Sequence, residues 1–337
     1  MTLQILWFIL IGVLFIAFFF LEGFDFGTGI ATRLIGRTKA DRDQMVATIA
    51  PVWDGNEVWL LTAGGAIFAA FPHWYATMFS GYYIPLAVVL LALIFRGVSF
   101  EFRHKMESAR WQNVWDWALF VGSLLPPFLL GVLFTSMVKG MPIDANMNMH
   151  AGLFDYISLY SLVGGIAVTL LCLLHGLNYI SLRTLGGVRE KAKSLAQKLY
   201  SVLYGGLVVF AVLTFFYTDF FKEKAIAIIL ILGAIVVLSL LAHLFVSKKR
   251  EALAVISSGL TLGLVVILLF VGLYPRVMVS SIDQLYSMTI QMAASGDYTL
   301  KIMTVVTVCV LPFVLVYQAW CYYVFRKRIS SEPIAHE

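Results

Sequence analysis

Nine runs of apolar residues, each about as long as a helix needs to cross a lipid bilayer, constrain this chain more than any other feature. A crossing takes about 20 apolar residues, and it must be helical because lipid offers no partners to exposed backbone groups. Only 13% of the residues are charged, about half of what a soluble domain carries. The sequence therefore predicts an all-α polytopic membrane protein. The nine expected spans are roughly 4–30, 52–71, 79–102, 114–137, 154–180, 199–217, 225–246, 253–274 and 300–325.

The distribution of Lys and Arg predicts how these spans are oriented. Of the 24 Lys and Arg residues, 19 fall in one set of alternate connections together with the C-terminal tail. Connections on the cytoplasmic side carry such an excess. We therefore expect the N-terminus outside and the C-terminus in the cytoplasm. The longest connection, 275–299, then lies outside, where it can hold a short interfacial helix.

A weak internal repeat divides the chain into parts. The stretch LEGFDFGTGIATRLIG (21–36) ends the first span, and LLHGLNYISLRTLGG (173–187) ends the fifth. With a three-residue gap, Gly23 matches Gly176, Asp25 matches Asn178, Arg33 matches Arg183 and Gly36 matches Gly186. Either two related four-helix bundles or chance similarity between apolar helix ends explains the match. On the first interpretation the parts are a bundle in 1–137 with the intramembrane acids, a bundle in 138–274, and an outer loop, peripheral ninth helix and cytoplasmic tail in 275–337.

Acidic residues inside the expected spans are the most informative chemical feature. The stretch WDGNEVWLLTAGGAIFAAF (53–71) places Asp54 and Glu57 three residues apart, and the first span does the same with Glu22 and Asp25. Residues three apart share one face of a helix. A charged group in hydrocarbon costs several kcal/mol, or about 3 kcal/mol on insertion scales, unless it is paired or hydrated. Other polar or aromatic candidates nearby are Trp53, Asn56, Arg96, Glu101 and Asp116.

Two interpretations of these acids remain open at the level of sequence. In the structural one, the acids pair with Arg96, with Arg33 and with one another, and small residues let the helices approach closely. Those small residues are Gly23, Gly27, Gly64 and Gly65. In the functional one, the acids form a proton or ion path, since intramembrane ionisable residues are functional candidates by default.

Histidine and cysteine offer little for cofactor or metal binding. Haem ligation by this chain would need His175 or His243, and a lone His on an apolar helix more often bonds to a neighbour. We therefore expect no haem iron to be ligated by this chain. The loop NMNMHAG contains Met147, Met149 and His150, which suit soft metals but have no specific spacing.

Several classes of function find no support in the sequence. The three cysteines all fall within apolar runs without a CxxC pair, which excludes a disulfide framework of the secreted kind. Nucleotide-binding glycine loops, zinc patterns and a nucleophile elbow are also missing from the sequence. The net charge of +5 follows the membrane rule and does not indicate nucleic-acid binding.

Long and specific stretches give the chain a family resemblance. LEGFDFGTGIATRLIGR, IAPVWDGNEVWLLTAGGAIFAAFP, FSGYYIPLAVVLLALIFRGVSFEFR and RWQNVWDWALFVGS resemble subunit II of the cytochrome bd quinol oxidases, as does the C-terminal part from SSIDQLYSMTI onward. The resemblance implies a complex in the bacterial cytoplasmic membrane that oxidises quinol and reduces oxygen to water with protons from the cytoplasm. It also implies that haems b and d belong to a partner, subunit I, and that a small single-helix subunit often lies alongside.

The resemblance further assigns a proton-path role to Glu22 and Asp54. It matches Asp25, Trp53, Arg96, Glu101 and Asp116 to other characteristic positions. Glu stands at 22 and 101 where the family also allows Asp, which changes the reach of the side chain. Two rival functions stay open. One is a transporter or ion-channel subunit, although Pro/Gly-broken helices at matching positions of the two halves are missing from the sequence. The other is a purely structural subunit of the oxidase.

Overall fold

A computed structural model describes residues 2–330 of the chain, and within them almost all regular structure is helical. The C-terminal end of the expected tail, 331–337, lies outside the described residues. The helices are α1 (Leu3–Leu34), α2 (Lys39–Ile49), α3 (Trp53–Ala70), α4 (Pro72–Gly81), α5 (Tyr83–Phe102), α6 (Ala109–Lys139), α7 (Leu153–Tyr156), α8 (Leu159–Arg183), α9 (Gly187–Tyr217), α10 (Phe220–Ser247), α11 (Glu251–Leu273), α12 (Ile290–Ala293) and α13 (Asp297–Val324). The short 3₁₀ helix η1 (Gln284–Tyr286) and the antiparallel strands β1 (Arg276–Met278) and β2 (Met288–Thr289) complete the set.

Each of the nine expected spans coincides with a helix. Eight helices among the described residues are long and apolar enough to cross a membrane: α1, α5, α6, α8, α9, α10, α11 and α13. The segment expected at 52–71 forms α3, an 18-residue helix that carries Asp54 and Glu57 and is not among these eight. The two acids that make this segment interesting also lower its mean hydropathy.

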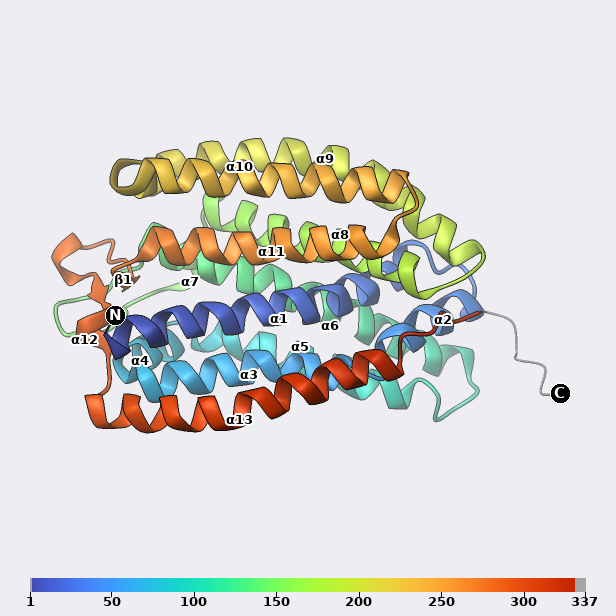
Figure 1. Cartoon of the computed structure of the whole chain (residues 1–337), viewed down its shortest axis with the longest axis horizontal. Helices are drawn as coiled ribbons and strands as arrows, with labels where there is room; N and C mark the ends of the chain where they lie inside the picture. Colours follow the sequence, from blue (N-terminus) through green and yellow to red (C-terminus); the bar gives the residue numbers. More distant parts are fainter. Residues whose placement is uncertain (1, 331–337) are drawn as a thin grey trace.

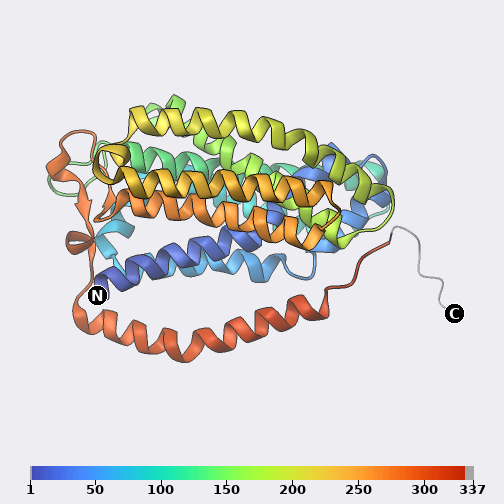
Figure 2. The ribbon, with the colours of Figure 1, turned by 45° about the horizontal axis from the view of Figure 1, so that its top comes forward.

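The long helices run side by side along the longest axis of the molecule, and α13 lies at the edge (Figures 1 and 2). In the centre, α1 packs on α3, α6, α8 and α11, while α8 packs on α6, α9 and α11. The pairs α5–α6 and α10–α11 pack closely as well. The two halves share a contact pattern: the pairs α1–α3, α1–α6 and α5–α6 of the first correspond to α8–α9, α8–α11 and α10–α11 of the second. The packing of α9 on α10 has no counterpart between α3 and α5.

Glycine allows the closest of these crossings. A Cβ added at Gly27 on α1 would lie 1.9 Å from the Cys172 carbonyl oxygen and 2.8 Å from the Gly176 Cα on α8. The backbones of α1 and α8 therefore touch at this point. The expectation for Gly64 and Gly65 was wrong: a Cβ at Gly65 would meet nothing within 4 Å, and one at Gly64 would only approach Phe79 at 3.9 Å. These two glycines line an open face of α3 instead of a crossing.

Two segments expected to be connections are helical, and the first of them has a capping box. In the expected loop 33–49, Thr38 Oγ1 accepts from the Asp41 backbone N–H at 3.1 Å, and Asp41 Oδ2 accepts from the Thr38 N–H, which starts α2. Burial acts to raise the pKa of Asp41, but hydrogen bonds from Lys191 and the Thr38 backbone outweigh it and lower the pKa. The helix α9 begins 12 residues before the expected 199, directly after Gly186, whose φ is +72°.

The two ends of the bundle differ. At the end with the N-terminus, the segments 140–152 and 274–296 interlock: the Met141 N–H donates to Val279 O at 2.9 Å, and the Ser281 N–H donates to Met141 O at 2.8 Å. At the opposite end, the tail is held by Ile329, whose N–H donates to Arg183 O and whose carbonyl accepts from Gln44 Nε2. We call these the N-terminal end and the tail end.

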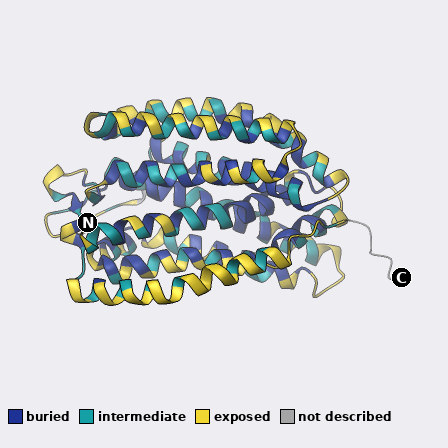
Figure 3. Cartoon of the chain, viewed as in Figure 1, coloured by how far each residue is buried: buried dark blue, intermediate teal, exposed yellow. Residues whose placement is uncertain are grey.

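The outer helices carry many exposed residues (Figure 3), and large apolar side chains are common among them. The outer helices α9, α10 and α13 expose many large aliphatic and aromatic residues, and Leu300 is the one buried residue of α13, which is described in full. Such a surface suits lipid or a partner helix rather than water. The expected peripheral position of the ninth helix matches α13.

Candidate functional site

The acids of α1 lie in the interior, where Arg96 of α5 reaches them. Glu22, Asp25 and Arg96 are each 0% exposed. Arg96 Nη1 donates to Glu22 Oε1 in a short contact and also lies 3.4 Å from Glu57 Oε2 on α3. The guanidinium carbon is 4.9 Å from the centre of the Phe26 ring, so aromatic faces cover part of the cation. We call Glu22, Asp25, Asn56, Glu57 and Arg96 the carboxylate cluster.

Asn56 links this cluster to the peripheral helix. Its Nδ2 donates to Asp25 Oδ2 at 2.7 Å. Its Oδ1 accepts from Gln318 Nε2 at 3.0 Å and from the Tyr322 hydroxyl at 2.6 Å, both on α13. Sequence reasoning missed Gln318 and Tyr322. The available signal was two polar groups four residues apart, on one face of an otherwise apolar run.

The cluster contains more negative than positive groups. Glu22, Asp25 and Glu57 face a single guanidinium, so full ionisation would leave two buried negative charges without a counter-ion. Such charges are strongly unfavourable in a medium of low dielectric constant, and a buried carboxylate in this position is neutralised by a proton. Full ionisation of the three carboxylates is therefore unfavourable with Arg96 as the one cation that the described residues place among them.

Unused hydrogen-bonding capacity also gathers here. Within the described part of the chain, Glu22 Oε2, Asp25 Oδ1, Arg96 Nε and Arg96 Nη2 are buried without a partner. Buried polar atoms are normally satisfied, so each such atom needs an explanation. Two acceptors and two donors of the cluster thus lack partners among the described residues, as does Arg103 Nη1 beside Asp116.

The residues at the start of α3 connect the cluster to the surface. The Glu57 side chain is 20% exposed and Asp54, one turn earlier, is exposed. Trp53 stacks on Phe100 of α5, with ring centres 4.9 Å apart and planes 14° apart. The two residues of α3 that reach the α1 acids are thus Asn56 and Glu57, whereas Asp54 lies on the outer side.

Asp116 and Glu101 lie outside the cluster. Asp116 of α6 accepts from Arg42 Nε and from Arg103 Nη2, each at 2.7 Å, at the tail end of the bundle. Glu101 is exposed near the end of α5. The expected pairing of Arg33 with the acids was wrong: among the described residues its guanidinium bonds to Asn113 and lies over the Trp117 ring. Arg33 ends up there because α1 presents it beside the start of α6.

His175 has no free ring nitrogen for haem ligation. The two ring nitrogens of His175 are bonded to Ser258 Oγ at 2.8 Å and to Phe20 O at 2.9 Å. His243 bonds through Nδ1 to the Tyr204 hydroxyl and stacks on Tyr200. Among the described residues, no three His, Cys, Asp or Glu side chains come together as a metal site. His150 of the methionine loop bonds to Asp144.

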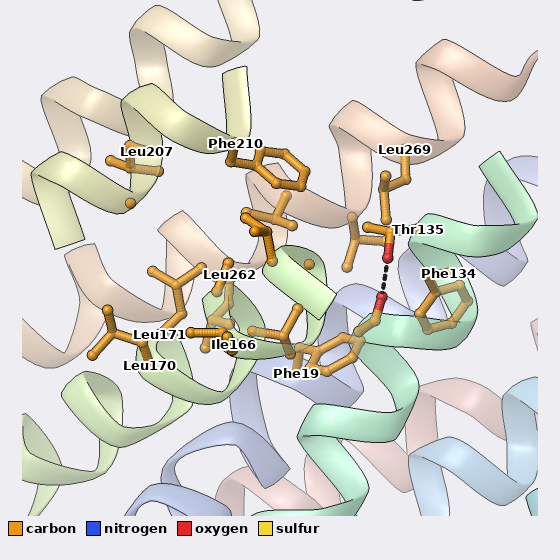
Figure 4. Close-up of a pocket in the computed structure, with 18 of the residues that line it drawn as sticks. Phe19, Phe134, Thr135, Ile166, Leu170, Leu171, Leu207, Phe210, Leu262 and Leu269 are labelled. Carbon is orange, nitrogen blue, oxygen red and sulfur yellow. Dashed lines mark hydrogen bonds between the residues drawn. The ribbon is translucent and has the colours of Figure 1, made fainter. Parts of the chain in front are cut away.

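An apolar cavity of about 190 Å³ lies on the other side of α1, between α6, α8, α9 and α11 (Figure 4). Its wall includes Phe19, Phe134, Phe210 and Leu262. The hydroxyl of Thr135 turns away to the Gly131 carbonyl of its own helix at 2.6 Å, so it offers no donor to the cavity. None of the candidate site residues lines this cavity, so it suits only an apolar molecule.

These features define a class: a multi-pass helical membrane protein with a buried cluster of carboxylates around one arginine in its interior. The family model for cytochrome bd terminal oxidase subunit II matches residues 3–325, and the chain belongs to this family. The eight apolar helices and this membership make it a multi-pass protein of the bacterial cytoplasmic membrane.

Individual relatives agree with the assignment. The chain is 52% identical to cytochrome bd ubiquinol oxidase subunit 2 of Bacillus subtilis (strain 168), over 99% of each chain. It is 35% identical to cytochrome bd-I ubiquinol oxidase subunit 2 of Escherichia coli (strain K12), over 99% of this chain and 97% of that one. A chain of the bd oxidase structure from Geobacillus thermodenitrificans matches with a TM-score of 0.77, covering 97% of this chain and 100% of that one. At 15% identity, this match shows the fold alone.

Proposed function

We propose that this chain is subunit II of a membrane-bound terminal quinol oxidase of the cytochrome bd type, an electrogenic quinol:oxygen oxidoreductase. The family membership and the names of the relatives support this proposal. Subunit I is the main partner and holds haems b and d, which supply the oxygen chemistry when bound, with quinol as the substrate. The hydrogen bonds of His175 support the view that this chain ligates no haem itself.

The proposed architecture has nine spans, with the N-terminus outside and the C-terminus in the cytoplasm. The Lys and Arg distribution supports the orientation, and the tail end carries α2 and the arginines that bind Asp116. We count α3 as a span because it lies along α1. Helices of 1–137 and of 138–274 make equivalent contacts, which supports two four-helix bundles, with 275–337 as an appended part. We further propose that the bundles support subunit I and that a small single-helix subunit binds nearby.

The carboxylate cluster is proposed to carry protons from the cytoplasm. This proposal rests mainly on the excess of buried carboxylates over cations, together with the unpartnered oxygens of Glu22 and Asp25. Asp116, by contrast, faces two arginines, Arg42 and Arg103, and both of its oxygens are paired.

The geometry suggests an order for the steps. Asp54 and Glu57 take up protons at the exposed side of α3, close to its start at the tail end. Glu57 and Glu22 share Arg96, so a proton gained at Glu57 frees the guanidinium for Glu22 and lets that residue release its own proton. Asp25 lies one turn from Glu22 and is held by Asn56. Arg96 stays charged and sets the balance between the acids.

The remaining candidates receive different roles. We propose that Asp116 anchors α6 to α2 and α5 through Arg42 and Arg103, outside the proton path. Glu101 is proposed to collect protons at the cytoplasmic surface, since it is exposed near the end of α5. Trp53 is proposed to hold the start of α3 against α5 through its stacking on Phe100.

The proposal is tested by oxygen consumption of the purified complex carrying Glu22→Gln, Asp25→Asn or Asp54→Asn. An amide keeps size and hydrogen bonding but carries no proton. We expect full haem content and slower turnover in each variant. Asp219→Asn is the matched control, because Asp219 is a carboxylate in a two-bond pair with Arg276 outside the cluster. Assembled Glu22 and Asp25 variants with the turnover of this control would assign the acids to structure.

A further inference from the structure

A second polar cluster lies in the second half, at the position equivalent to the carboxylate cluster. The alignment that pairs Asp25 with Asn178 also pairs Glu22 with His175. Asp25 of α1 bonds to Asn56 of α3, and Asn178 of α8 donates to the Tyr200 hydroxyl of α9 at 2.9 Å. Both halves thus join their first two long helices at matching places, by a charged group in one half and by neutral groups in the other.

The hydrogen bonds of His175 fix its tautomer. A carbonyl oxygen only accepts, so Nε2 carries the hydrogen that binds Phe20 O on α1. Nδ1 is then the acceptor for the hydroxyl of Ser258 on α11. The ring fits between helices because residue 259 is glycine: a Cβ there would lie 3.0 Å from His175 Cε1. His175 therefore links α1, α8 and α11.

A small cavity lies next to this link. It measures about 10 Å³ as the space open to the centre of a water-sized sphere, close to the least that one water molecule needs. Most of its lining surface is apolar, and four of the residues that line it carry a hydroxyl group. They are Tyr200 of α9, Ser239 of α10, and Ser258 and Thr261 of α11.

The hydrogen-bonding groups of this wall are complementary to water. Tyr200 is 1% exposed and its oxygen accepts from Asn178, but its own hydrogen has no acceptor within residues 2–330. The hydroxyls of Ser239 and Thr261 donate to carbonyls of their own helices and keep lone pairs free. One buried donor and several free acceptors therefore belong to residues around the same cavity, and a water molecule that reaches them can accept from the first and donate to the others.

We infer that the second half binds one buried water molecule between Tyr200 and Ser258. The water accepts from Tyr200 and donates to hydroxyl oxygens of α10 and α11. It completes a hydrogen-bonded chain from Phe20 O through His175, Ser258, the water and Tyr200 to Asn178. A cation fits less well, because the cavity is lined by hydroxyls and apolar groups without a carboxylate.

The test is a structure of the whole purified oxidase at a resolution that shows ordered water. We expect a density peak within about 3.2 Å of both Tyr200 Oη and Ser258 Oγ. Tyr200→Phe removes the one free donor and should remove the peak. Tyr204→Phe is the matched control: it lies one turn along α9, bonds to His243 instead and does not line the cavity, so the peak should remain.

Three results would overturn the inference. The first is a wild-type cavity without density in a map that shows buried water elsewhere. The second is a peak that survives Tyr200→Phe unchanged. The third is a peak that disappears when sodium is replaced by choline in the buffer, because that marks a cation. If Tyr200→Phe fails to assemble, the wild-type maps in sodium and in choline still decide between water, cation and an unfilled cavity.

Discussion

Removing Arg96 should be the most damaging single change in the interior of the first half. Arg96 is 0% exposed and is the one cation bound to Glu22 and Glu57 among the described residues. Arg96→Gln keeps a polar side chain of moderate size but leaves these carboxylates without a positive partner. The change therefore tests whether the cluster depends on charge balance.

The expected magnitude follows from the burial of the pair. Breaking a fully buried ion pair by removing one partner costs about 3–5 kcal/mol. At roughly 2 °C per kcal/mol for a large chain, this corresponds to a drop in Tm of about 6–10 °C. Replacing both partners, in Arg96→Gln with Glu22→Gln, removes a charge of each sign, so the double variant should recover about 0.5–3 kcal/mol relative to the sum of the single losses.

The assay is thermal unfolding of the purified complex, followed by fluorescence, for the wild type, both single variants and the double variant. Arg110→Gln serves as control because Arg110 is exposed, and its effect should stay within about 0.5 kcal/mol. A Tm of Arg96→Gln equal to that of the control would refute the reasoning. Strict additivity of the two single losses would show that Arg96 and Glu22 do not stabilise each other.

Three further predictions concern packing, pH and topology. Gly27→Ala should lower stability by about 1–3 kcal/mol or more, because the added Cβ would overlap the Cys172 carbonyl of α8. A Cβ at Gly205 would meet no atom within 4 Å, so Gly205→Ala should be neutral in the same melting assay. Burial acts to raise the pKa of Asp219, but the hydrogen bonds and charge of Arg276 outweigh it and hold the pKa below its usual 3.8. The pair therefore stabilises the fold above pH 3.8, and this stabilisation is lost as the pH falls through the lowered pKa. The Tm of Asp219→Asn should thus lie below that of the wild type at pH 7 and equal it in acid. An equal Tm difference at both pH values would contradict the prediction. Cysteines that replace the exposed residues Lys222 and Lys301 should react with an impermeant label from outside, and cysteines that replace Lys105 and Lys249 should react from the cytoplasm. Labelling of the cysteines at 105 and 222 from the same side would disprove the nine-span topology.

Sequence patterns predicted the helices well because lipid imposes a strict length and composition on each crossing. Every expected span is a helix, and even α3 coincides with 52–71 despite its acids. The patterns missed α2 and the early start of α9, because these segments are polar and their helices depend on caps and on packing against the bundle. Composition alone does not distinguish such segments from loops.

The site was predicted in part. The spacing of three correctly indicated a shared face for Glu22 and Asp25, but Asp54 and Glu57 turn to different sides. Arg96 was correctly expected to pair with the acids, whereas Asn56 bonds to Asp25 of α1 and not to the acids of its own helix. Which acids meet was beyond the sequence, because that depends on how far each helix is rotated against its neighbour. Asn56 and Glu57 turn inward while Asp54 turns outward, and Asp116 lies with Arg42 and Arg103 instead. The part played by α13 was missed because Gln318 and Tyr322 are single polar groups in an apolar run.

The measurement that tests the central claim most directly is proton uptake from the cytoplasmic side during a single turnover. Wild-type and Glu22→Gln oxidase would be placed in vesicles, reduced by quinol and mixed with oxygen, with a pH-sensitive dye reporting uptake. If protons pass through the carboxylate cluster, uptake in the variant should slow by about 10²–10⁴-fold, while reduction of the haems by quinol keeps its normal rate. Uptake at the wild-type rate in a fully assembled variant would contradict the account.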